Sequence, residues 1–436
     1  MRKEAYIPGT GSTRRSVLVG TAAGATGLAL ASGAPGASAA SATGSAAGRG
    51  FGPGAGPGAF VKTRGSGFTV DGTAFRFGGT NCYYLHQQSH YMIDNALDDI
   101  HAMGLPVVRA WAFADGTSSS YTALQPEPYV YDDAAFDALD YAIWKAGQLG
   151  IRLVLALVNN WPDYGGMAQY VTWFLNLPDD SYGAAVNHDK FYTTESIKDC
   201  YKAYARYVTQ RFNKYTGLRY CDDPTIMTFE LANEPRSRSD KTGVALLGWI
   251  TEMGAYIKGL APRQLVAVGD EGFYGDADNS DYPYSNYEGD RWRDFIAVPT
   301  IDYGTVHLYP QSWGETPSND GTDPVAWGTT WIENHLADGA AAGKPVVIEE
   351  YGLSVDGSVI TDEATRDAGY AAWTGAVLAG GGAGDQFWLL TSRVDDGSFY
   401  PDYDGYRVMW FNDPTNPTVN LARQLAAHAA AMAAAG

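Results

Sequence analysis

Two short segments of the sequence place a glutamate beside other polar residues, directly after an apolar run. Glu234 lies in Asn233-Glu234-Pro235, and Glu350 lies in Glu349-Glu350-Tyr351-Gly352. Hydrolysis of a glycosidic bond needs two carboxyl groups, one that protonates the leaving oxygen and one that attacks the sugar or activates water. The two segments therefore predict this chemistry, with retention if the carboxyl groups lie about 5–5.5 Å apart and inversion if the gap is wider.

Other polar side chains at the ends of apolar runs fit the same chemistry. Arg109 can keep a neighbouring carboxylate ionised, and Tyr309 can donate a hydrogen bond to it. His307 can bond to the proton donor or to the sugar, and Asn233 can contact the sugar hydroxyl at position 2. The combination with the two glutamates favours an active site over a set of isolated ion pairs.

Glu230 and Glu349 have a second interpretation. Each alternates with apolar neighbours on its predicted strand, and one face of such a strand belongs to the core. A buried structural carboxylate that is paired with Arg or Lys is therefore the alternative to a catalytic role for either residue.

Short apolar runs alternate with amphipathic stretches over most of the sequence. Helical spacings of three and four predict helices over 132–149, 195–215, 244–260 and 419–435. The apolar runs predict eight strands, at 75–81, 106–111, 152–158, 225–231, 264–268, 303–307, 345–349 and 386–390.

Eight strand–helix units predict a closed (β/α)8 TIM barrel, as a single catalytic domain over residues 60–436. A doubly wound sheet is the alternative, but it normally has fewer strands and a glycine-rich phosphate turn after the first strand. The run Gly380–Gly384 precedes a strand, so it is expected to be a tight turn at the N-terminal end of the barrel. In this fold, catalytic side chains come from the opposite, C-terminal ends of the strands, where the residues above are placed.

These motifs and their order resemble glycoside hydrolase family 5 of clan A, with the greater similarity to its endo-β-1,4-mannanases. The similarity spans about residues 60–430. It is carried by Asn233-Glu234-Pro235 with Glu350-Tyr351-Gly352, and by the segments 79–84, 108–113, 157–166, 222–236, 271–275 and 306–310.

The resemblance implies specific roles. Glu234 is then the acid/base and Glu350 the nucleophile of a retaining enzyme that hydrolyses internal β-1,4 bonds of mannan, glucomannan or galactomannan. Trp388 is implied to be the platform under the sugar that is attacked. The implied substrate-binding residues are Arg109, Trp111, Asn159, Trp161, Asn233, Arg236, His307, Tyr309 and Trp388, with Arg236 on the leaving-group side. The segment Gln386–Thr391 departs from the family pattern, which bears on fine specificity.

The N-terminus predicts export. Arg14-Arg15 with the flanking Ser12–Leu18 resembles a twin-arginine signal, an Ala/Gly-rich stretch follows, and Ala37-Ser38-Ala39 is a small-residue cleavage site. We therefore expect residues 1–40 to be a signal peptide, residues 41–59 to be a Gly/Ala/Pro-rich linker or disordered segment, and the protein to be secreted.

The net charge is −19, which disfavours nucleic acid or an anionic membrane surface as a partner. A neutral polysaccharide or oligosaccharide suits such a chain, which is expected to act as a monomer without a metal or other cofactor. Of the three cysteines, Cys82 is interpreted as a packing residue, and Cys200 and Cys221 can pair only if the chain returns along its own helix.

Two rival functions stay open from the residues. Another retaining β-glycosidase of the same barrel class, an exo-β-mannosidase or a β-1,4-glucanase, is the first, and the long segment 278–292 is able to block one end of a cleft. A catalytically silent barrel that binds carbohydrate is the second, and the presence of both Glu234 and Glu350 argues against it.

Overall fold

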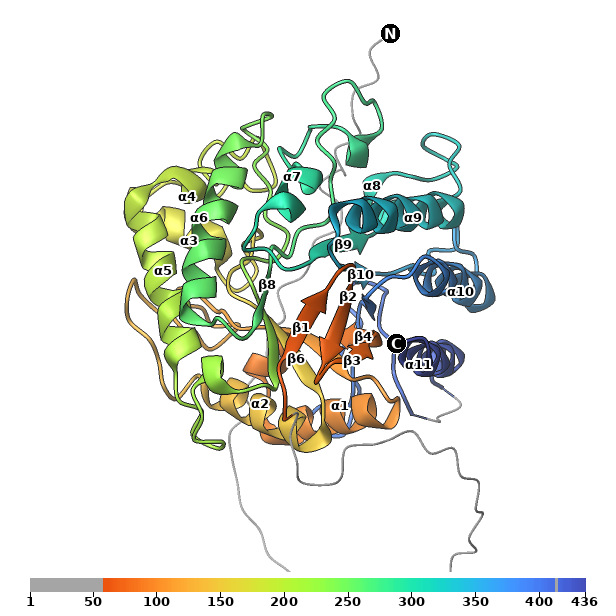
Figure 1. The fold of residues 1–436 in the computed structure, drawn as a ribbon, viewed down its shortest axis with the longest axis horizontal. Coiled ribbons are helices and arrows are strands. Elements are labelled where there is room, and N and C mark those ends of the chain that lie inside the picture. Colours follow the sequence, from red (N-terminus) through yellow and green to blue (C-terminus); the bar gives the residue numbers. More distant parts are fainter. Residues whose placement is uncertain (1–57, 412–414) are drawn as a thin grey trace, which may run out of the picture.

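Eight parallel strands enclosed by helices make up the body of the protein in a computed structural model that describes residues 58–411 and 415–436 (Figure 1). The expected signal peptide, residues 1–40, and all but the last two residues of the segment 41–59 lie outside the described residues, so export stays a prediction. In the part of the chain that is described, no helix combines the length and the apolar character needed to cross a membrane.

The strands of the barrel confirm the eight predicted from the sequence, with ends that differ by up to three residues. Their hydrogen-bonded order is β8-β7-β6-β5-β4-β11-β10-β9, so the first strand of the barrel pairs with the last. Between β8 and β9, the Asp302 N–H donates to the Val266 carbonyl at 2.8 Å, and the His307 N–H donates to the Glu271 carbonyl at 3.0 Å. The order excludes a doubly wound sheet. The strands are β4 (Phe77–Asn81), β5 (Val107–Trp111), β6 (Arg152–Ala156), β7 (Ile226–Glu230), β8 (Leu265–Ala267), β9 (Gly304–Leu308), β10 (Val346–Tyr351) and β11 (Gly384–Phe387).

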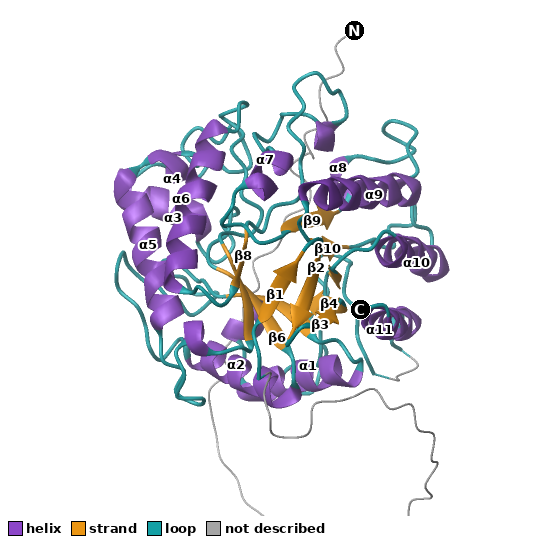
Figure 2. Ribbon diagram, in the orientation of Figure 1, coloured by secondary structure: helices purple, strands orange, loops and turns teal. Residues whose placement is uncertain are grey.

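Helices form the outer ring around these strands (Figure 2). The longer ones are α1 (His90–Ala102), α2 (Asp137–Leu149), α3 (Gly166–Leu175), α5 (Glu195–Gln210), α6 (Val244–Leu260), α9 (Pro324–Ala342), α10 (Glu363–Ala379) and α11 (Val419–Ala434). Short helical turns lie in the connections: η1 (Tyr83–Gln87), α4 (Lys190–Thr193), η2 (Tyr220–Asp222), η3 (Tyr282–Tyr284), α7 (Trp292–Ala297) and α8 (Pro310–Trp313). As predicted, the run Gly380–Gly384 joins α10 to β11 at the N-terminal end of the barrel.

Two of the predicted helix bounds were wrong. Helix α2 begins at Asp137 instead of residue 132, because the Asp132 carboxylate accepts the N–H groups of Ala134 and Ala135 in a separate turn. Helix α5 ends at Gln210 instead of residue 215, because the chain turns back and residues 212 and 219 form an isolated antiparallel bridge. Helical periodicity continued past both boundaries, so local hydrogen bonds decided them.

A small antiparallel sheet that the sequence analysis did not predict covers the N-terminal end of the barrel. Its strands are β1 (Val61–Arg64), β2 (Gly67–Val70) and β3 (Thr73–Phe75), which lie in front of the barrel strands in Figure 1. Phe68 is 2% exposed, and its ring packs edge-on against Tyr303 with 5.4 Å between centroids. The sheet therefore closes the floor of the barrel with apolar side chains.

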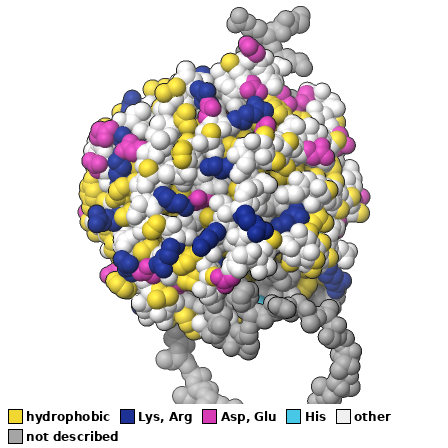
Figure 3. All heavy atoms as spheres, in the orientation of Figure 1, with side chains coloured by type: hydrophobic (Ala, Val, Ile, Leu, Met, Phe, Trp, Pro, Cys, Tyr) yellow, Lys and Arg dark blue, Asp and Glu magenta, His cyan; other side chains and the backbone are white. Residues whose placement is uncertain are grey.

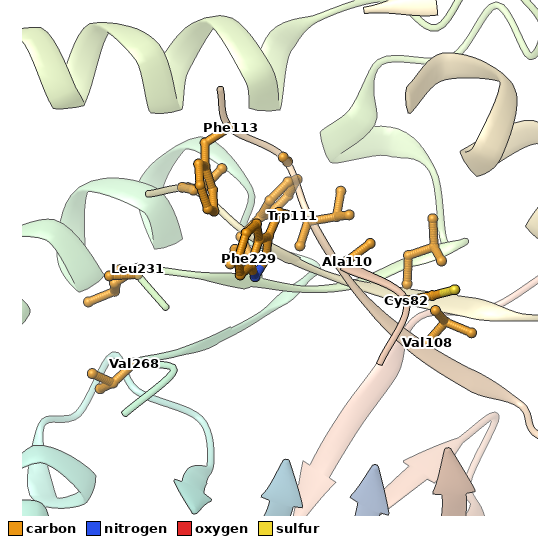
Figure 4. Packing of buried hydrophobic residues seen from close by; sticks show 14 of the residues in the cluster. Cys82, Val108, Ala110, Trp111, Phe113, Phe229, Leu231 and Val268 are labelled. Carbon is orange, nitrogen blue, oxygen red and sulfur yellow. The ribbon is translucent and has the colours of Figure 1, made fainter. Parts of the chain in front are cut away.

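The larger core lies between the strands and the helices. Figure 4 shows part of it and labels Val108 and Ala110 of β5 and Phe229 of β7 among its members. Side chains alternate along a strand, so Val107 of β5 instead joins the smaller cluster inside the barrel, together with Phe68. The same alternation turns Arg109 toward the interior, where its partners lie.

All three cysteines are free and buried, so Cys200 and Cys221 form no disulfide. Cys221 instead lies 3.5 Å from the side-chain amide of Gln210. Cys82 belongs to the larger core, and burial raises the pKa of its thiol to about 12. The thiol is thus neutral, which agrees with its interpretation as a packing residue.

Lys and Arg side chains are spread over the face that carries the small sheet (Figure 3), although the chain as a whole is acidic. Two cations of the chain, Arg76 and Lys344, donate to carbonyls near helix ends. Arg76 donates to the carbonyl of Leu378 in the last turn of α10 at 3.2 Å and to the carbonyl of Gly382 just after this helix at 2.9 Å. Lys344 donates to the carbonyl of Val298, directly after α7, at 3.1 Å. Cations at the C-terminal ends of helices satisfy open carbonyls and oppose the helix dipole. This structural role accounts for these cations without a bound anion.

Replacing Phe68 with alanine tests the contribution of the small sheet. We expect Phe68→Ala to lower the free energy of unfolding by about 3–5 kcal/mol, because it leaves a cavity in the barrel floor. Urea unfolding measures this, with Phe212→Ala as the control, since Phe212 is 66% exposed and should change stability by about 0.5 kcal/mol or less. Equal stabilities of the two variants would show that the sheet does not brace the barrel.

Candidate active site

The predicted catalytic residues meet at the C-terminal ends of the barrel strands. Arg109 comes from β5, His307 from β9 and Glu350 from β10, while Glu234 lies four residues beyond the end of β7. A β/α barrel presents its reactive groups at this end, because the strand ends and the loops that follow them converge there.

A break in the regular pairing of β10 turns two consecutive glutamates the same way. Successive side chains of a strand normally point to opposite faces. The register between β10 and β9 shifts between Ile348 and Glu350, so that Glu350 pairs with His307. Arg109 then contacts both glutamates, at 3.5 Å from Glu349 and 2.5 Å from Glu350. Such irregularities commonly re-aim a side chain at an active site.

The loop that carries Glu234 is tied to the strands on both sides. The Asn233 N–H donates to the carbonyl of Val158, and the Glu234 N–H donates to that of Gly269, both at 2.7 Å. Gly269 has a φ of +83°, which only glycine adopts without strain, and a Cβ there would lie 2.0 Å from the Ala232 carbonyl oxygen. Glu234 itself has a φ of +51°, a left-handed conformation that persists because these bonds over-determine the loop.

The guanidinium of Arg109 lies fully buried at the centre of the site. Its Nε donates to Glu230 Oε2 at 2.8 Å, and its Nη1 donates to Glu350 Oε1 at 2.5 Å and to Asn81 Oδ1 at 3.3 Å. Its Nη2 donates to Asn233 Oδ1 at 2.8 Å. The planar group thus holds residues from three segments of the barrel in one arrangement.

Both oxygens of Glu350 accept hydrogen bonds, as the sequence analysis predicted. Arg109 holds Oε1, and the Tyr309 hydroxyl donates to Oε2 at 2.8 Å. Burial raises the pKa of Glu350, and the charges of His307 and Arg109 offset part of that rise while Glu234 adds to it. The net shift is upward, but two donors aimed at the carboxylate stabilise the ionised form that a nucleophile requires.

Glu234 shares a proton with His307. His307 Nδ1 lies 2.8 Å from Glu234 Oε1, and the Trp161 Nε1–H donates to Oε2 at 2.5 Å. Burial alone would raise the pKa of Glu234, but the bond to His307 and the charges of His307 and Arg236 outweigh it, so the net shift is downward. Burial opposes the charge on His307, yet Glu350, Glu234 and Glu349 raise its pKa well above 6.5. The two opposite shifts place the proton of the pair on His307, which can pass it to Glu234 over their hydrogen bond.

The spacing of the two carboxylates suits a retaining reaction. One ligand atom from each of Glu234, His307 and Glu350 lies within 4.8 Å of the others. A gap near 5 Å leaves no room for a water molecule between sugar and carboxylate, so one glutamate attacks directly. The four carboxylate oxygens already accept bonds from Arg109, Tyr309, His307 and Trp161, a donor set that fits paired carboxylates and not metal ligands.

Aromatic rings line one side of the site. Trp388 is partly exposed, and its Nε1–H donates to Asp404 at 2.8 Å. Tyr83 stacks on Trp388 with 5.3 Å between centroids and an 8° angle between planes. Trp111 lies buried behind Tyr83 at 4.7 Å, so it supports this wall. The sequence analysis named both tryptophans, but it missed Tyr83 and Asp404, which position Trp388.

Asn159 does not lie where the sequence analysis placed it. It was predicted to bind substrate, but it is fully buried, and its Oδ1 accepts the Asn233 Nδ2–H at 2.9 Å. Asn233 in turn bonds to Arg109. Because no atom of Asn159 is exposed, it acts through Asn233 by fixing the orientation of the Asn233 amide.

Trp161 and Arg236 lie on the Glu234 side of the site, and a third residue extends this side. The Arg236 guanidinium lies 4.9 Å from the Trp161 ring centroid and pairs with both oxygens of Glu271, at 2.6 and 2.7 Å. Tyr182 stacks on Trp161 with 5.0 Å between centroids, although the Tyr182 side chain is 58% exposed. Nothing in the local sequence distinguishes Tyr182 from other loop tyrosines, so only the structure identifies it.

Comparison with known proteins agrees with this geometry. Residues 58–388 match the family model described as GH family 5 beta-mannosidase-like. Mannan endo-1,4-beta-mannosidase 7 of Arabidopsis thaliana is 36% identical over 381 residues, which cover 84% of each chain.

Two solved structures share the fold over most of the chain. The endo-beta-1,4-mannanase of Thermotoga petrophila is 41% identical with a TM-score of 0.72, and the match covers 82% of this chain and 77% of that one. The endo-1,4-beta-mannanase of Rhizomucor miehei is 36% identical with a TM-score of 0.74, covering 86% and 99%. Since both the family model and relatives above 30% identity span most of the sequence, the chain belongs to the β-mannosidase-like glycoside hydrolases of family 5.

Proposed function

We propose that this protein is a retaining endo-β-1,4-mannanase that cleaves internal bonds of mannan, glucomannan or galactomannan by double displacement. The observation that carries the proposal is the pair Glu234 and Glu350, with one ligand atom of each within 4.8 Å and a distinct set of donors around each. The activities named for its relatives from Arabidopsis thaliana and Thermotoga petrophila support the choice of mannan.

In the first step, Glu234 protonates the glycosidic oxygen while a carboxylate oxygen of Glu350 attacks the anomeric carbon. The bond to the leaving sugar breaks, its electron pair takes the proton, and an ester between the sugar and Glu350 forms. Trp161 donates to Glu234, and His307 shares its proton. These contacts support Glu234 as the proton donor to the leaving group.

In the second step, the ionised Glu234 takes a proton from water as the water oxygen attacks the same carbon. The ester bond breaks, and Glu350 regains its negative charge with the stereochemistry retained. Arg109 and Tyr309 hold both of its oxygens, so the carboxylate is stabilised as a leaving group without rearrangement of the site.

Product analysis tests the proposal. Mannohexaose, glucomannan and cellulose are incubated with the enzyme side by side, and chromatography identifies the products. Endo action on mannan predicts a mixture of short mannooligosaccharides, slower release from glucomannan and little from cellulose. Mannose as the sole product would instead identify an exo-β-mannosidase, and preferential hydrolysis of cellulose would identify a β-1,4-glucanase.

Replacement of the two glutamates should affect different steps. We expect Glu234→Ala to reduce the hydrolysis of mannohexaose by about 10²–10⁴-fold, since its proton is required, but to reduce that of a dinitrophenyl β-mannoside much less. Added azide should restore turnover of the activated substrate by forming a β-mannosyl azide.

Glu350→Gln is the matched control for this experiment, because it removes the attacking oxygen that both substrates need. It should abolish turnover of both, with an unchanged circular dichroism spectrum. If azide rescues neither variant, or if Glu350→Gln retains activity, the two roles are assigned wrongly.

The exposed ring of Tyr182 should bind sugar units of the leaving group. Tyr182→Ala is expected to lower kcat/KM on mannohexaose by about three- to tenfold, through KM, because a stacking surface beside Trp161 is lost. Tyr182→Phe keeps the ring and should behave like the wild type. Steady-state kinetics on mannohexaose and on an aryl mannoside, which lacks leaving-group sugars, separate binding from folding, with Phe212→Ala as the remote control. An equal loss on both substrates would contradict this role.

A further inference from the structure

Two glutamates that the proposed mechanism does not use lie beneath the reacting pair. Glu230 ends β7 and Glu349 lies in β10, and neither is exposed. The same atom, Arg109 Nε, lies 2.8 Å from Glu230 Oε2 and 3.5 Å from Glu349 Oε2. One guanidinium edge therefore contacts two carboxyl groups that have no access to solvent.

Most carboxyl oxygens of Glu230 and Glu349 have no hydrogen-bond donor. Among the described residues, Glu230 Oε1 and both oxygens of Glu349 accept no hydrogen bond from any N–H or hydroxyl group. A buried anionic oxygen without a donor is strongly disfavoured, and two adjacent buried carboxylates repel each other. A proton on one of them removes both problems, because the protonated carboxyl becomes the missing donor.

The surroundings of the two glutamates favour a single negative charge on the pair. Burial raises the pKa of Glu230 well above 4.5, and neighbouring Glu349 adds to the rise, whereas Arg109 offsets only part of it. Burial also acts to raise the pKa of Glu349, but the charges of Arg109 and His307 oppose that rise, and the net shift is downward. The pair therefore holds one proton and one negative charge, and Glu349 is the member that lies beside His307.

The charge on Glu349 faces the residue that shares the catalytic proton. Glu349 Oε2 lies 3.8 Å from His307 Nε2, and His307 Nδ1 bonds to Glu234 on the other edge of the ring. His307 Nε2 has no other partner among the described residues. A line of ionisable groups therefore runs from Glu230 through Glu349 and His307 to Glu234.

Few other charges lie around this line. Glu350 of β10 faces the opposite edge of the ring, with its Oε2 3.7 Å from His307 Nδ1. Arg109 from β5 is the one cation that touches both glutamates, and Asp270 after β8 has a pKa raised to about 7 by burial, which the hydrogen bond from Thr305 and the charge of His307 partly offset. The hydroxyl of Tyr303 bonds to Thr228, and it is uncharged since burial raises its pKa well above 10. The Gln386 amide from β11 is buried and neutral. Glu349 thus supplies the negative charge nearest to His307 Nε2.

We propose that Glu230 and Glu349 hold one proton between them, and that their single negative charge, which faces His307 through Glu349, keeps His307 protonated as the reservoir for the acid/base Glu234. Glu349 is then a positioning residue that acts through His307, and Glu230 is the partner whose proximity limits the pair to a single charge. This role rests on the proposed retaining mechanism, because that mechanism requires one proton on the Glu234–His307 pair before the leaving group departs.

The arrangement predicts where activity ends at high pH. A group whose pKa is raised stays protonated until the pH passes that raised value, so the proton supply should be lost only well above pH 6.5. Glu349→Gln removes the charge that faces His307 Nε2, and the alkaline limb of kcat/KM should move down by about one pH unit or more. Glu230→Gln leaves the carboxylate of Glu349 facing His307, so it should leave the alkaline limb within about 0.3 pH units of the wild type.

The test compares these two isosteric variants by kinetics and by NMR. The pH dependence of kcat/KM is measured on mannohexaose, which needs the proton, and on a dinitrophenyl β-mannoside, which does not. The shift in Glu349→Gln should be seen on mannohexaose alone. Titration of ¹⁵N-labelled histidine, with the His307 signal assigned by its loss in His307→Gln, should show a lower His307 pKa in Glu349→Gln and an unchanged one in Glu230→Gln.

Two outcomes would overturn this inference. Equal shifts in both variants would mean that both glutamates are ionised, and an unshifted His307 in Glu349→Gln would mean that Glu349 does not act on it. The NMR titration does not require turnover, so it also reads out a variant that is inactive. A wild type that fails to cleave mannan yet shows the predicted His307 titration would contradict the proposed substrate and leave this inference standing.

Discussion

The structure depends on one buried cation, the guanidinium of Arg109 on the barrel axis. It bonds to Asn81, to Glu230 and Asn233, and to Glu350, which lie on three segments that are remote in sequence. A buried charge is tolerated only when its partners are in place, and each of these partners needs Arg109 for the same reason. Closure of the barrel and assembly of the active site are therefore one event, because neither is complete while the guanidinium lacks its acceptors.

Two pairs of ionisable side chains lie around this cation, and each pair shares one proton. Glu234 and His307 share one proton at the mouth, and the proposed pair Glu230 and Glu349 shares another below. Charges interact strongly where water is excluded, so the protonation state of each pair constrains that of the other. A glutamate that must be acid in one step and base in the next benefits from such a reservoir, since the proton moves over a single hydrogen bond.

The two ends of the barrel have different roles: one end stabilises the fold, and the other carries the active site. At one end, Phe68 and the small sheet fill the barrel with apolar side chains, and cations such as Arg76 satisfy helix ends. At the other end, the strands stop and loops such as the one with Glu234 hold strained, hydrogen-bonded conformations. The rigid floor and ring of helices allow the upper loops to keep conformations that would not persist alone. Tyr182 occupies such a loop and extends the site outward from Trp161.

The sequence by itself determined the eight strands and the barrel they form, because hydrophobic periodicity is a local pattern that can be recognised without the structure. It also identified the polar residues at the strand ends that form the candidate active site. It predicted the contacts of Arg109 and Tyr309 with Glu350 correctly, yet it missed the small sheet, extended α5 too far and placed the buried Asn159 against the substrate. The resemblance assigned the nucleophile to Glu350 and not to Glu349, but only the tertiary structure gave the physical reason: a register shift in β10 turns both glutamates inward, and the contacts of Arg109 and Tyr309 then distinguish Glu350 from Glu349. Protonation was likewise decided in three dimensions, because a pKa depends on burial and on charges brought together from distant strands.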